Sequence, residues 1–169
     1  KILTKKIQEI TPNIAIVSEE SSNHKLVKNL KNFWLIDPID GTRDYINNRD
    51  EFTLNAALII DRKPAIGIIA VPAKRRLFYS YGISNSYELV DNHEISLIKI
   101  KKNYNEFTAV SYSDELKPEI LEIHKKYNIV SYQKMKSSLK FCVVAASEFD
   151  MYVAEPRACE WDIAAGHAI

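Results

Sequence analysis

The chain has 169 residues, of which 46% are hydrophobic and 27% are charged, and its formal net charge at pH 7 is +1. This length and composition are those of one globular domain with a substantial core, and they exclude a disordered or fibrous chain. So small a net charge gives no reason to expect binding to nucleic acid or to a membrane through charge alone. No apolar run approaches the roughly 20 residues of a membrane span, and we expect neither a transmembrane segment nor a signal peptide.

The first part of the chain predicts a helix followed by extended segments. Hydrophobic residues at helical spacing mark residues 1–10, and a short apolar run marks a buried strand over 14–17. A second buried strand is expected at 33–36. Runs rich in β-branched and aromatic residues at 52–60, 65–71 and 77–81 predict an antiparallel meander. Short strands are expected after it, at 87–90 and 94–100. The basic cluster Lys74–Arg76 is expected to be a solvated turn between two strands of the meander.

The second part alternates between strands and helices. Strands are expected at 107–112, 128–132 and 149–153, and helices at 114–127, 137–146 and 163–168. Pro118 is compatible only with the first turn of its helix. We expect a serine to cap the helix that starts at Ser137-Ser138.

The stretch Asp37-Pro38-Ile39-Asp40-Gly41-Thr42 is the strongest candidate site. It follows an apolar strand, and Pro38 should turn the backbone at once so that the two carboxylates face one point. Carboxylates this close repel unless a cation lies between them, and oxygen ligands favour a hard ion such as Mg²⁺. The Ile39 carbonyl could add a third oxygen, and the N–H groups that follow Gly41 could bind a phosphate. The alternative is structural, with Asp37 capping a turn and Asp40 capping a helix.

Other polar residues give weaker signals. Glu19 and Glu20 follow the strand at 14–17 and are either a second carboxylate pair or part of a solvated loop. Cys142 and Cys159 lack metal-ligand spacing and suit reduced thiols in a cytoplasmic protein. No serine has the strand-turn-helix setting of a serine hydrolase. The four histidines also lack ligand spacing, so we interpret them as structural or surface residues: His24, His93, His124 and His167.

Three separated stretches together follow one pattern: Ser18-Glu19-Glu20, the motif of residues 37–42, and Trp161-Asp162-Ile163-Ala164-Ala165-Gly166. In this order the chain resembles the inositol monophosphatase superfamily of Mg²⁺-dependent phosphatases. It is most similar to the 3′(2′),5′-bisphosphate nucleotidase branch, on the segments Thr42–Ile46, Glu51–Asn55 and Ser137–Cys142. The resemblance implies an α/β fold of layered αβαβα architecture, with a larger α+β half over 1–105 and a smaller α/β half over 106–169 that form one functional unit.

The resemblance also implies roles for individual residues. The Mg²⁺ ligands would be Glu19, Asp37, the Ile39 carbonyl, Asp40 and Asp162. Glu20 would act beside them. Gly41 and Thr42 would contact the scissile phosphate, with Thr42 also orienting the attacking water. Ser137 and Lys140 would face the nucleotide, with Lys140 pairing with its second phosphate.

The sequence departs from the family pattern at several places. In the family, an Asp upstream of the position of Lys1 helps to activate water, and a further strand and helix follow the Trp-Asp helix. We therefore expect the fold to be incomplete at both termini. Lys136 stands where a Gly is usual and is expected to hinder close approach to the ligand. Ala154 replaces a substrate-contacting Arg, for which Arg157 is a candidate substitute. Tyr112 and Asp114 replace an Arg and a His.

These observations leave three functional hypotheses. The first is a phosphatase that converts 3′-phosphoadenosine 5′-phosphate to AMP and phosphate. The second is a catalytically silent chain that binds only metal or a partner, and the third is an inositol or sugar monophosphatase. We expect a small nucleotide bisphosphate as partner, no nucleic acid, and either a homodimer or complementary segments. The expected location is the cytoplasm, with the inner membrane face as an alternative.

Overall fold

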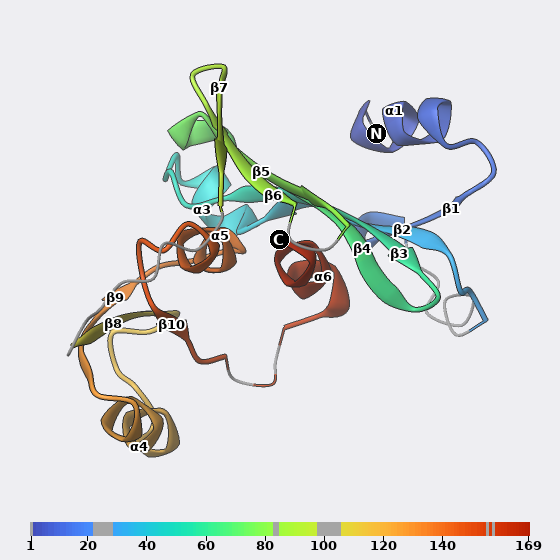
Figure 1. The fold of residues 1–169 in the computed structure, drawn as a ribbon. Helices are drawn as coiled ribbons and strands as arrows, with labels where there is room; N and C mark the ends of the chain where they lie inside the picture. Colours follow the sequence, from blue (N-terminus) through green and yellow to red (C-terminus); the bar gives the residue numbers. More distant parts are fainter. Residues whose placement is uncertain (1, 22–28, 83–84, 98–105, 155, 157) are drawn as a thin grey trace.

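The computed structural model describes residues 2–21, 29–82, 85–97, 106–154, 156 and 158–169 (Figure 1). The helices are α1 (Ile2–Ile10), η1 (Glu19–Ser21), α3 (Thr42–Ile46), η2 (Pro72–Lys74), α4 (Pro118–Lys126), α5 (Leu139–Ala145) and α6 (Glu160–Ala168). The strands are β1 (Ala15–Ser18), β2 (Phe33–Asp40), β3 (Thr53–Ile60), β4 (Lys63–Val71), β5 (Arg76–Tyr81), β6 (Ser86–Val90), β7 (His93–Ser96), β8 (Phe107–Ser111), β9 (Ile129–Lys134) and β10 (Met151–Tyr152).

The larger sheet follows the order of the chain from β1 to β7. The pair β1 and β2 is parallel, and every later pair is antiparallel. The antiparallel meander predicted for 52–81 is confirmed as β3, β4 and β5. Asp61 and Arg62, between β3 and β4, both have positive φ, which is the backbone of a two-residue hairpin turn that matches the strand twist. The strand expected at 94–100 is confirmed only as β7, and residues 98–100 lie outside the described part.

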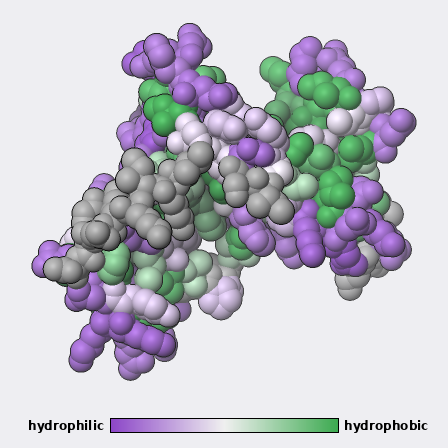
Figure 2. Space-filling view, viewed as in Figure 1, coloured by the Kyte–Doolittle hydropathy of each residue, from purple (hydrophilic) through white to green (hydrophobic). Residues whose placement is uncertain are grey.

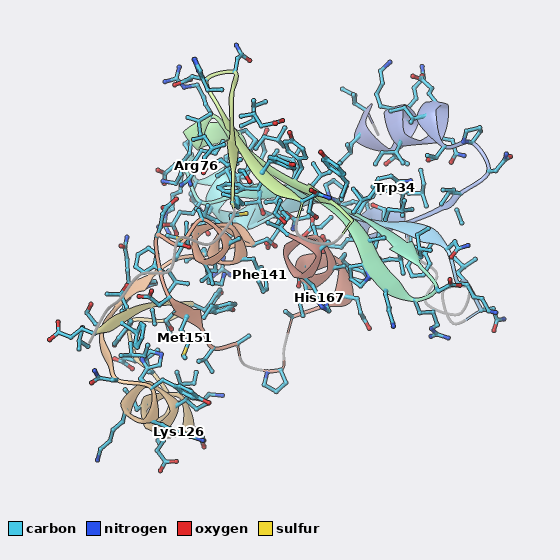
Figure 3. All side chains as sticks on the ribbon, in the orientation of Figure 1. Trp34, Arg76, Lys126, Phe141, Met151 and His167 are labelled. Carbon is cyan, nitrogen blue, oxygen red and sulfur yellow. The ribbon has the colours of Figure 1, made fainter. Side chains whose placement is uncertain are left out.

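The two faces of this sheet carry different partners. Helices α5 and α6 pack on one face, over a core that includes Leu35, Ile69 and Phe78. Helix α1 packs on the other face, over Trp34 and Ile36 (Figure 3). The Trp34 indole N–H also donates a hydrogen bond of 3.0 Å to the Thr11 hydroxyl. Figure 2 shows hydrophobic residues around α1 and the strands beneath it, whereas α4 presents a hydrophilic surface.

The smaller sheet has the order β10-β8-β9, and all its strands are parallel. Helices α5 and α6 lie between the two sheets, and α4 lies on the far side of the smaller one (Figure 1). The layers are therefore helix, sheet, helix pair, sheet and helix, which confirms the predicted fold class. Helix α4 begins at Pro118, four residues later than expected, because proline fits the first helical position and not the interior.

Three of the histidines can be placed. His124 of α4 is buried with its ring 5.8 Å from the ring of Tyr132, and burial lowers the pKa of His124 below its ordinary value. His93 and His167 are exposed, and His24 lies outside the described residues. The structural or surface role predicted for the histidines is confirmed for the three that the structure describes.

Arg76 corrects the expectation of a solvated basic turn. Its guanidinium donates to the carboxylates of Glu88 on β6 and Glu148 after α5, and it lies 4.7 Å from the centre of the Phe78 ring. Arg76 is the first residue of β5, and its side chain turns toward the helix layer, which a local sequence pattern does not reveal (Figure 3). Lys74 and Arg75 are exposed, as expected.

Candidate metal centre

The aspartate motif forms the end of β2. Strand β2 continues to Asp40, with an irregular register between Asp37 and Asp40, so the turn expected directly after Pro38 is wrong. The chain turns instead at Gly41, where φ is +87° and an added Cβ would lie 3.1 Å from the Glu51 carbonyl oxygen. Glycine suits this left-handed position because it has no Cβ. Helix α3 then starts at Thr42.

Three carboxylates meet at this point. Oxygen atoms of Asp37, Asp40 and Asp162 all lie within 4.8 Å of one another. The first two come from β2, and the third comes from the first turn of α6. The structure thus brings together the central motif and the distal Trp-Asp segment.

A backbone N–H holds one oxygen of each carboxylate. The Ile39 N–H donates to Asp37 Oδ1 at 3.0 Å, and the Cys159 N–H donates to Asp162 Oδ2 at 2.8 Å. The Ser138 N–H donates to Asp40 Oδ2 at 2.6 Å. Because each of these bonds uses a single oxygen, the other oxygen of each carboxylate can face a shared ligand.

The electrostatics of the centre favour a cation. Burial, the charge of Asp40 and the charge of Glu19 raise the pKa of Asp37 to about 8. Burial is also the largest cause of the raised pKa of Asp162, and the charges of Asp40 and Glu19 add to it. Like charges crowded in a desolvated site are costly unless a positive charge compensates them.

The donor set fits a hard divalent ion. All three side-chain donors are carboxylate oxygens, which Mg²⁺ and Ca²⁺ prefer. Two oxygens bound to one Mg²⁺ lie at most about 4 Å apart, because each Mg–O distance is about 2.1 Å. The spacing within this group of aspartates is close to that requirement, so these residues could hold such an ion.

Glu19 and Glu20 lie on η1, directly after β1. The Glu19 carboxylate is near enough to Asp37 to form a hydrogen bond with it. It is not part of the group formed by Asp37, Asp40 and Asp162. Both glutamates are exposed. The ligand role of Glu19 and the catalytic role of Glu20 stay predictions.

Thr42 and Ile39 contact each other. The Thr42 hydroxyl donates to the Ile39 carbonyl oxygen at 3.0 Å. A hydroxyl that has given its proton away still has lone pairs that can accept a hydrogen bond, and the carbonyl also has a second lone pair. The roles predicted for Ile39, Gly41 and Thr42 are compatible with this contact and stay predictions.

A pocket of about 260 Å³ opens beside the aspartate triad, the name that we use for Asp37, Asp40 and Asp162. Asp40, Asp162 and Ser137 line it together with the buried Lys140. The Lys140 ammonium donates to the Ser137 carbonyl and lies 5.3 Å from the centre of the Tyr152 ring and 5.7 Å from that of Tyr112. The pocket wall also includes Ala154, and the candidate substitute Arg157 lies outside the described residues.

Lys136 does not line this pocket. Its N–H donates to Glu51 Oε2 at 3.1 Å, and its ammonium is 3.4 Å from the carboxylate of the buried Asp44. These groups line a separate polar pocket of about 400 Å³. The Lys136 side chain therefore lies in this separate pocket and not in the pocket beside the aspartates, where we expected it to hinder the ligand.

Another groove lies elsewhere on the molecule. It measures about 520 Å³, and residues of β1, β2 and α6 such as Val17, Phe33 and Trp161 line it. None of the three clustered aspartates borders it. We place the candidate centre at the smaller pocket because the titratable groups converge there.

The sequence did not reveal two buried residues of the centre. Of the two serines that could cap α5, Ser137 accepts the Leu139 N–H at 3.4 Å. The Ser138 hydroxyl makes no capping hydrogen bond and lies 2.8 Å from Asp40 Oδ2. The amide of Asn55 donates to that hydroxyl at 2.9 Å. A usable signal existed on β3, because Thr53 and Asn55 occupy the alternate positions that should be apolar on a buried face.

The sequence matches the inositol monophosphatase family over residues 1–169, and the chain belongs to this family. Among similar curated proteins are the 3′(2′),5′-bisphosphate nucleotidases CysQ of Buchnera aphidicola and Salmonella typhimurium. The first is 32% identical and the match covers 99% of this chain and 63% of the relative. The second is 29% identical and the match covers 99% of this chain and 68% of the relative. The chain therefore spans about two thirds of the length of these relatives.

Solved structures agree with this assignment. The crystal structure of CysQ from Bacteroides thetaiotaomicron, a bacterial member of the inositol monophosphatase family, superposes with a TM-score of 0.78 at 29% identity. The match covers 98% of this chain and 69% of that structure. Mycobacterium tuberculosis SuhB gives a TM-score of 0.76 at 20% identity, over 99% of this chain and 67% of that one, and shows the fold alone.

The structure and the comparisons bear on whether the chain associates with a membrane. Within the described ranges, no helix is long and apolar enough to cross a lipid bilayer. The comparisons give no support to the inner membrane face that we expected as an alternative location.

Proposed function

We propose that this chain carries the centre of a Mg²⁺-dependent phosphatase that hydrolyses 3′-phosphoadenosine 5′-phosphate to AMP and phosphate. The observation that carries the proposal is the aspartate triad beside a pocket whose wall contains a buried lysine. Family membership and the names of the CysQ relatives support the reaction class and the substrate.

The carboxylates of Asp37, Asp40 and Asp162 would hold the metal, with Glu19 adjoining them. When bound, Mg²⁺ supplies positive charge to the phosphate oxygens and lowers the pKa of a bound water. The backbone N–H groups that fix one oxygen of each aspartate keep the three carboxylates in place before substrate arrives.

Other side chains would act on water and substrate directly. The Thr42 hydroxyl, whose proton points to Ile39, can accept a hydrogen bond from the attacking water and so orient it. Lys140 offers positive charge to a second phosphate from the wall of the pocket. The rings of Tyr112 and Tyr152 line the same wall and provide aromatic surface on which a nucleobase can stack.

The reaction balances without a covalent enzyme intermediate. The water oxygen forms a bond to phosphorus, and the bond between phosphorus and the ribose 3′ oxygen breaks. That oxygen takes a proton as it leaves, which gives AMP and inorganic phosphate. The protein's part is to orient the water, hold the phosphate and keep the nucleotide in the pocket.

The direct test is phosphate release from 3′-phosphoadenosine 5′-phosphate in Mg²⁺ buffer. We expect turnover by the wild-type chain and a loss of at least about 100-fold in Asp40→Asn, since even changes beside metal ligands cost up to about that factor. The matched control is Asp61→Asn, which makes the same chemical change in the exposed β3–β4 turn and should retain wild-type activity.

The alternatives predict different results. Absence of turnover by the wild-type chain, with metal binding intact, would favour the catalytically silent chain; Ala154 in the pocket wall, where the family has an Arg, is the observation behind it. Faster turnover of inositol monophosphate than of the bisphosphate nucleotide would favour the inositol or sugar monophosphatase.

A further inference from the structure

We propose that Ser138 is a positioning residue that fixes the Asp40 carboxylate and the start of α6 in the arrangement that binds metal. The inference rests on the proposed metal centre and concerns how the chain holds it. Ser138 is 1% exposed and comes directly before α5. The sequence gave it no role at the metal centre.

Ser138 makes two contacts with the same oxygen of Asp40. Its N–H donates to Oδ2 at 2.6 Å, and its hydroxyl lies 2.8 Å from that oxygen. Two neighbouring donors restrict rotation of the carboxylate more than a single hydrogen bond would. They leave Oδ1 of Asp40 as the oxygen available to a ligand shared with the other two aspartates.

The same hydroxyl reaches the helix that carries the third aspartate. It lies 2.7 Å from the backbone carbonyl of Asp162. A hydroxyl has one proton, so at any moment it donates either to Asp40 or to this carbonyl. The Asp40 carboxylate and the Asp162 carbonyl therefore both lie within hydrogen-bond distance of Ser138 Oγ. Ser138 and Asp40 are 98 positions apart in the sequence.

Asn55 holds the Ser138 hydroxyl in position through a buried hydrogen bond. Its amide donates to Ser138 Oγ at 2.9 Å, and the residue is fully buried on β3, opposite Asp37. Without the serine oxygen this donor would lose a buried partner, which is unfavourable because water cannot replace it. Asn55 therefore favours the one position of the hydroxyl that also reaches the metal ligands.

The backbone places Ser138 independently of any capping role. Ser137 has φ +53°, a left-handed conformation that is uncommon for a residue with a side chain. Residues held in such conformations persist where the surroundings determine them, often at functional sites. Here the turn aims both the N–H and the hydroxyl of Ser138 at Asp40, and the Ser138 hydroxyl makes no capping hydrogen bond to α5.

The chemical consequence is preorganisation. Groups that orient metal ligands raise affinity without touching the ion, and their loss commonly reduces metal affinity by about 10–100-fold. Removing the Ser138 hydroxyl should leave all metal ligands in the chain but free the Asp40 carboxylate to rotate. The backbone N–H contact would remain as the weaker restraint.

The test is the affinity of the full chain for Mn²⁺, measured from the electron paramagnetic resonance signal of free Mn²⁺. We expect Ser138→Ala to bind about 10–100-fold more weakly than wild type. The matched control is Ser80→Ala, which removes another buried hydroxyl, the acceptor of the Gly67 N–H at 3.2 Å, away from the aspartates. Ser80→Ala should keep wild-type affinity.

A second pair keeps the test decisive if Ser138→Ala does not fold. Ser138→Thr and Ser138→Val have the same shape and differ in the hydroxyl, so only Thr should retain affinity. Equal Mn²⁺ affinity in wild type and Ser138→Ala, or in the Thr and Val variants, would overturn the role of Ser138 and leave the proposed function intact. A wild-type chain that does not bind Mn²⁺ would overturn both.

Discussion

Asp37 carries much of the electrostatic cost of the aspartate centre. Its side chain is 1% exposed, and the charges of Asp40 and Glu19 add to the effect of burial. With a pKa of about 8, the carboxyl is mostly protonated at neutral pH in the metal-free protein. It can bind a cation there only after it loses that proton, so metal binding and proton release are linked.

We predict that Asp37 destabilises the metal-free protein as the pH rises. Its pKa in the folded state is above the ordinary value of 3.8, so its contribution to stability is complete below about pH 4 and is lost as the pH rises to about 8. Asp37→Asn keeps the shape without the charge, and its amide oxygen can still accept the Ile39 N–H. In EDTA, Asp37→Asn should therefore melt at a higher temperature than wild type at pH 8.

The pH dependence is the control for this prediction. At pH 4 the wild-type carboxyl is largely protonated, so the melting temperatures of the two proteins should converge. A variant that melts below wild type at pH 8 in EDTA would contradict the prediction. Excess Mg²⁺ at pH 8 should raise the melting temperature of wild type more than that of Asp37→Asn.

Residues with a charge were easier to predict than residues that orient them. The spacing of Asp37 and Asp40 is local, and the resemblance to the family adds Asp162. The role of Ser138 depends on a hydrogen bond between residues 98 positions apart, and no local pattern encodes it. The only role that the sequence suggested for a serine here was to cap α5, and Ser138 makes no such hydrogen bond.

Helix α6 lies very close to the larger sheet, where Gly67 of β4 is directly beneath it. A Cβ at Gly67 would be 2.3 Å from the Ala165 carbonyl oxygen and 2.9 Å from the Ala168 Cβ. On its other side, a Cβ at Gly166 would meet the Phe141 ring of α5 at 2.4 Å. Helix α6, which carries Asp162, therefore packs so closely against β4 and against Phe141 that only glycine fits at the two contact positions.

We predict that Gly67→Ala both destabilises the protein and weakens metal binding. The added methyl group forces α6 away from the sheet, and such overpacking costs about 1–3 kcal/mol. Because Asp162 moves with the helix, Mn²⁺ affinity should fall as well. Urea unfolding and Mn²⁺ titration of the same samples measure the two effects.

Gly82→Ala separates these effects. Gly82 has φ +67°, but among the described residues an added Cβ would make only an ordinary van der Waals contact, with Asn85 Nδ2 at 3.8 Å. The variant should lose about 1–2 kcal/mol through backbone strain alone and keep wild-type Mn²⁺ affinity. Unchanged Mn²⁺ affinity in Gly67→Ala would show that α6 does not transmit the strain to Asp162.

At the scale of elements, hydrophobic periodicity predicted most helices and strands, and boundaries were less certain. Strand β2 runs on to Asp40 because β3 pairs with it through Thr53, which a local rule for proline cannot anticipate. Strand β10 is limited to Met151 and Tyr152, where it pairs with β8. In both cases the partner strand, and not the local sequence, determines where the strand ends.

For the whole molecule, the Arg76 cluster connects layers that the chain builds separately. Its members are Arg76 on β5, Glu88 on β6 and Glu148 after α5. Burial alone would lower the pKa of Arg76, but hydrogen bonds to both glutamates outweigh it and raise the pKa further. The side chain of Glu88 is only 8% exposed, so it depends on this arginine for compensation of its charge.

We predict that Arg76→Met lowers the free energy of unfolding by about 3–5 kcal/mol, because it leaves Glu88 buried without a partner. Glu148 should add little, since its side chain is 42% exposed and water can solvate it. The double variant Arg76→Met/Glu88→Gln should recover part of the loss, because it removes the uncompensated charge. Urea unfolding of the single and double variants completes the cycle.

The neighbouring Arg75 provides a matched control. Its guanidinium lies 3.9 Å from Asp91, and both side chains are largely exposed, at 82% and 64%. Exposed pairs contribute at most about 1 kcal/mol, so Arg75→Met should be close to neutral. Equal losses for Arg75→Met and Arg76→Met would contradict the role assigned to the Arg76 cluster.

The overall architecture was predictable, but the ion pairs that connect its layers were not. The meander of β3 to β5 and the alternation after Phe107 are visible in the sequence, and the family resemblance turns them into five layers. Arg76 was misjudged because a basic run between two strands is typical of a solvent-exposed turn. Its two partners become neighbours only when the layers stack.

The order of the strands also bears on how the protein folds. Strands β3 to β7 pair with their neighbours in sequence, so the meander can form from short-range hairpins. The aspartate centre brings together Asp37 and Asp162, which are 125 positions apart in the sequence, and it closes only after α6 has docked. Contacts that form late raise the barrier to unfolding and leave the folding rate little changed. A cation bound at the centre would therefore prolong the lifetime of the folded state without helping the chain to reach it.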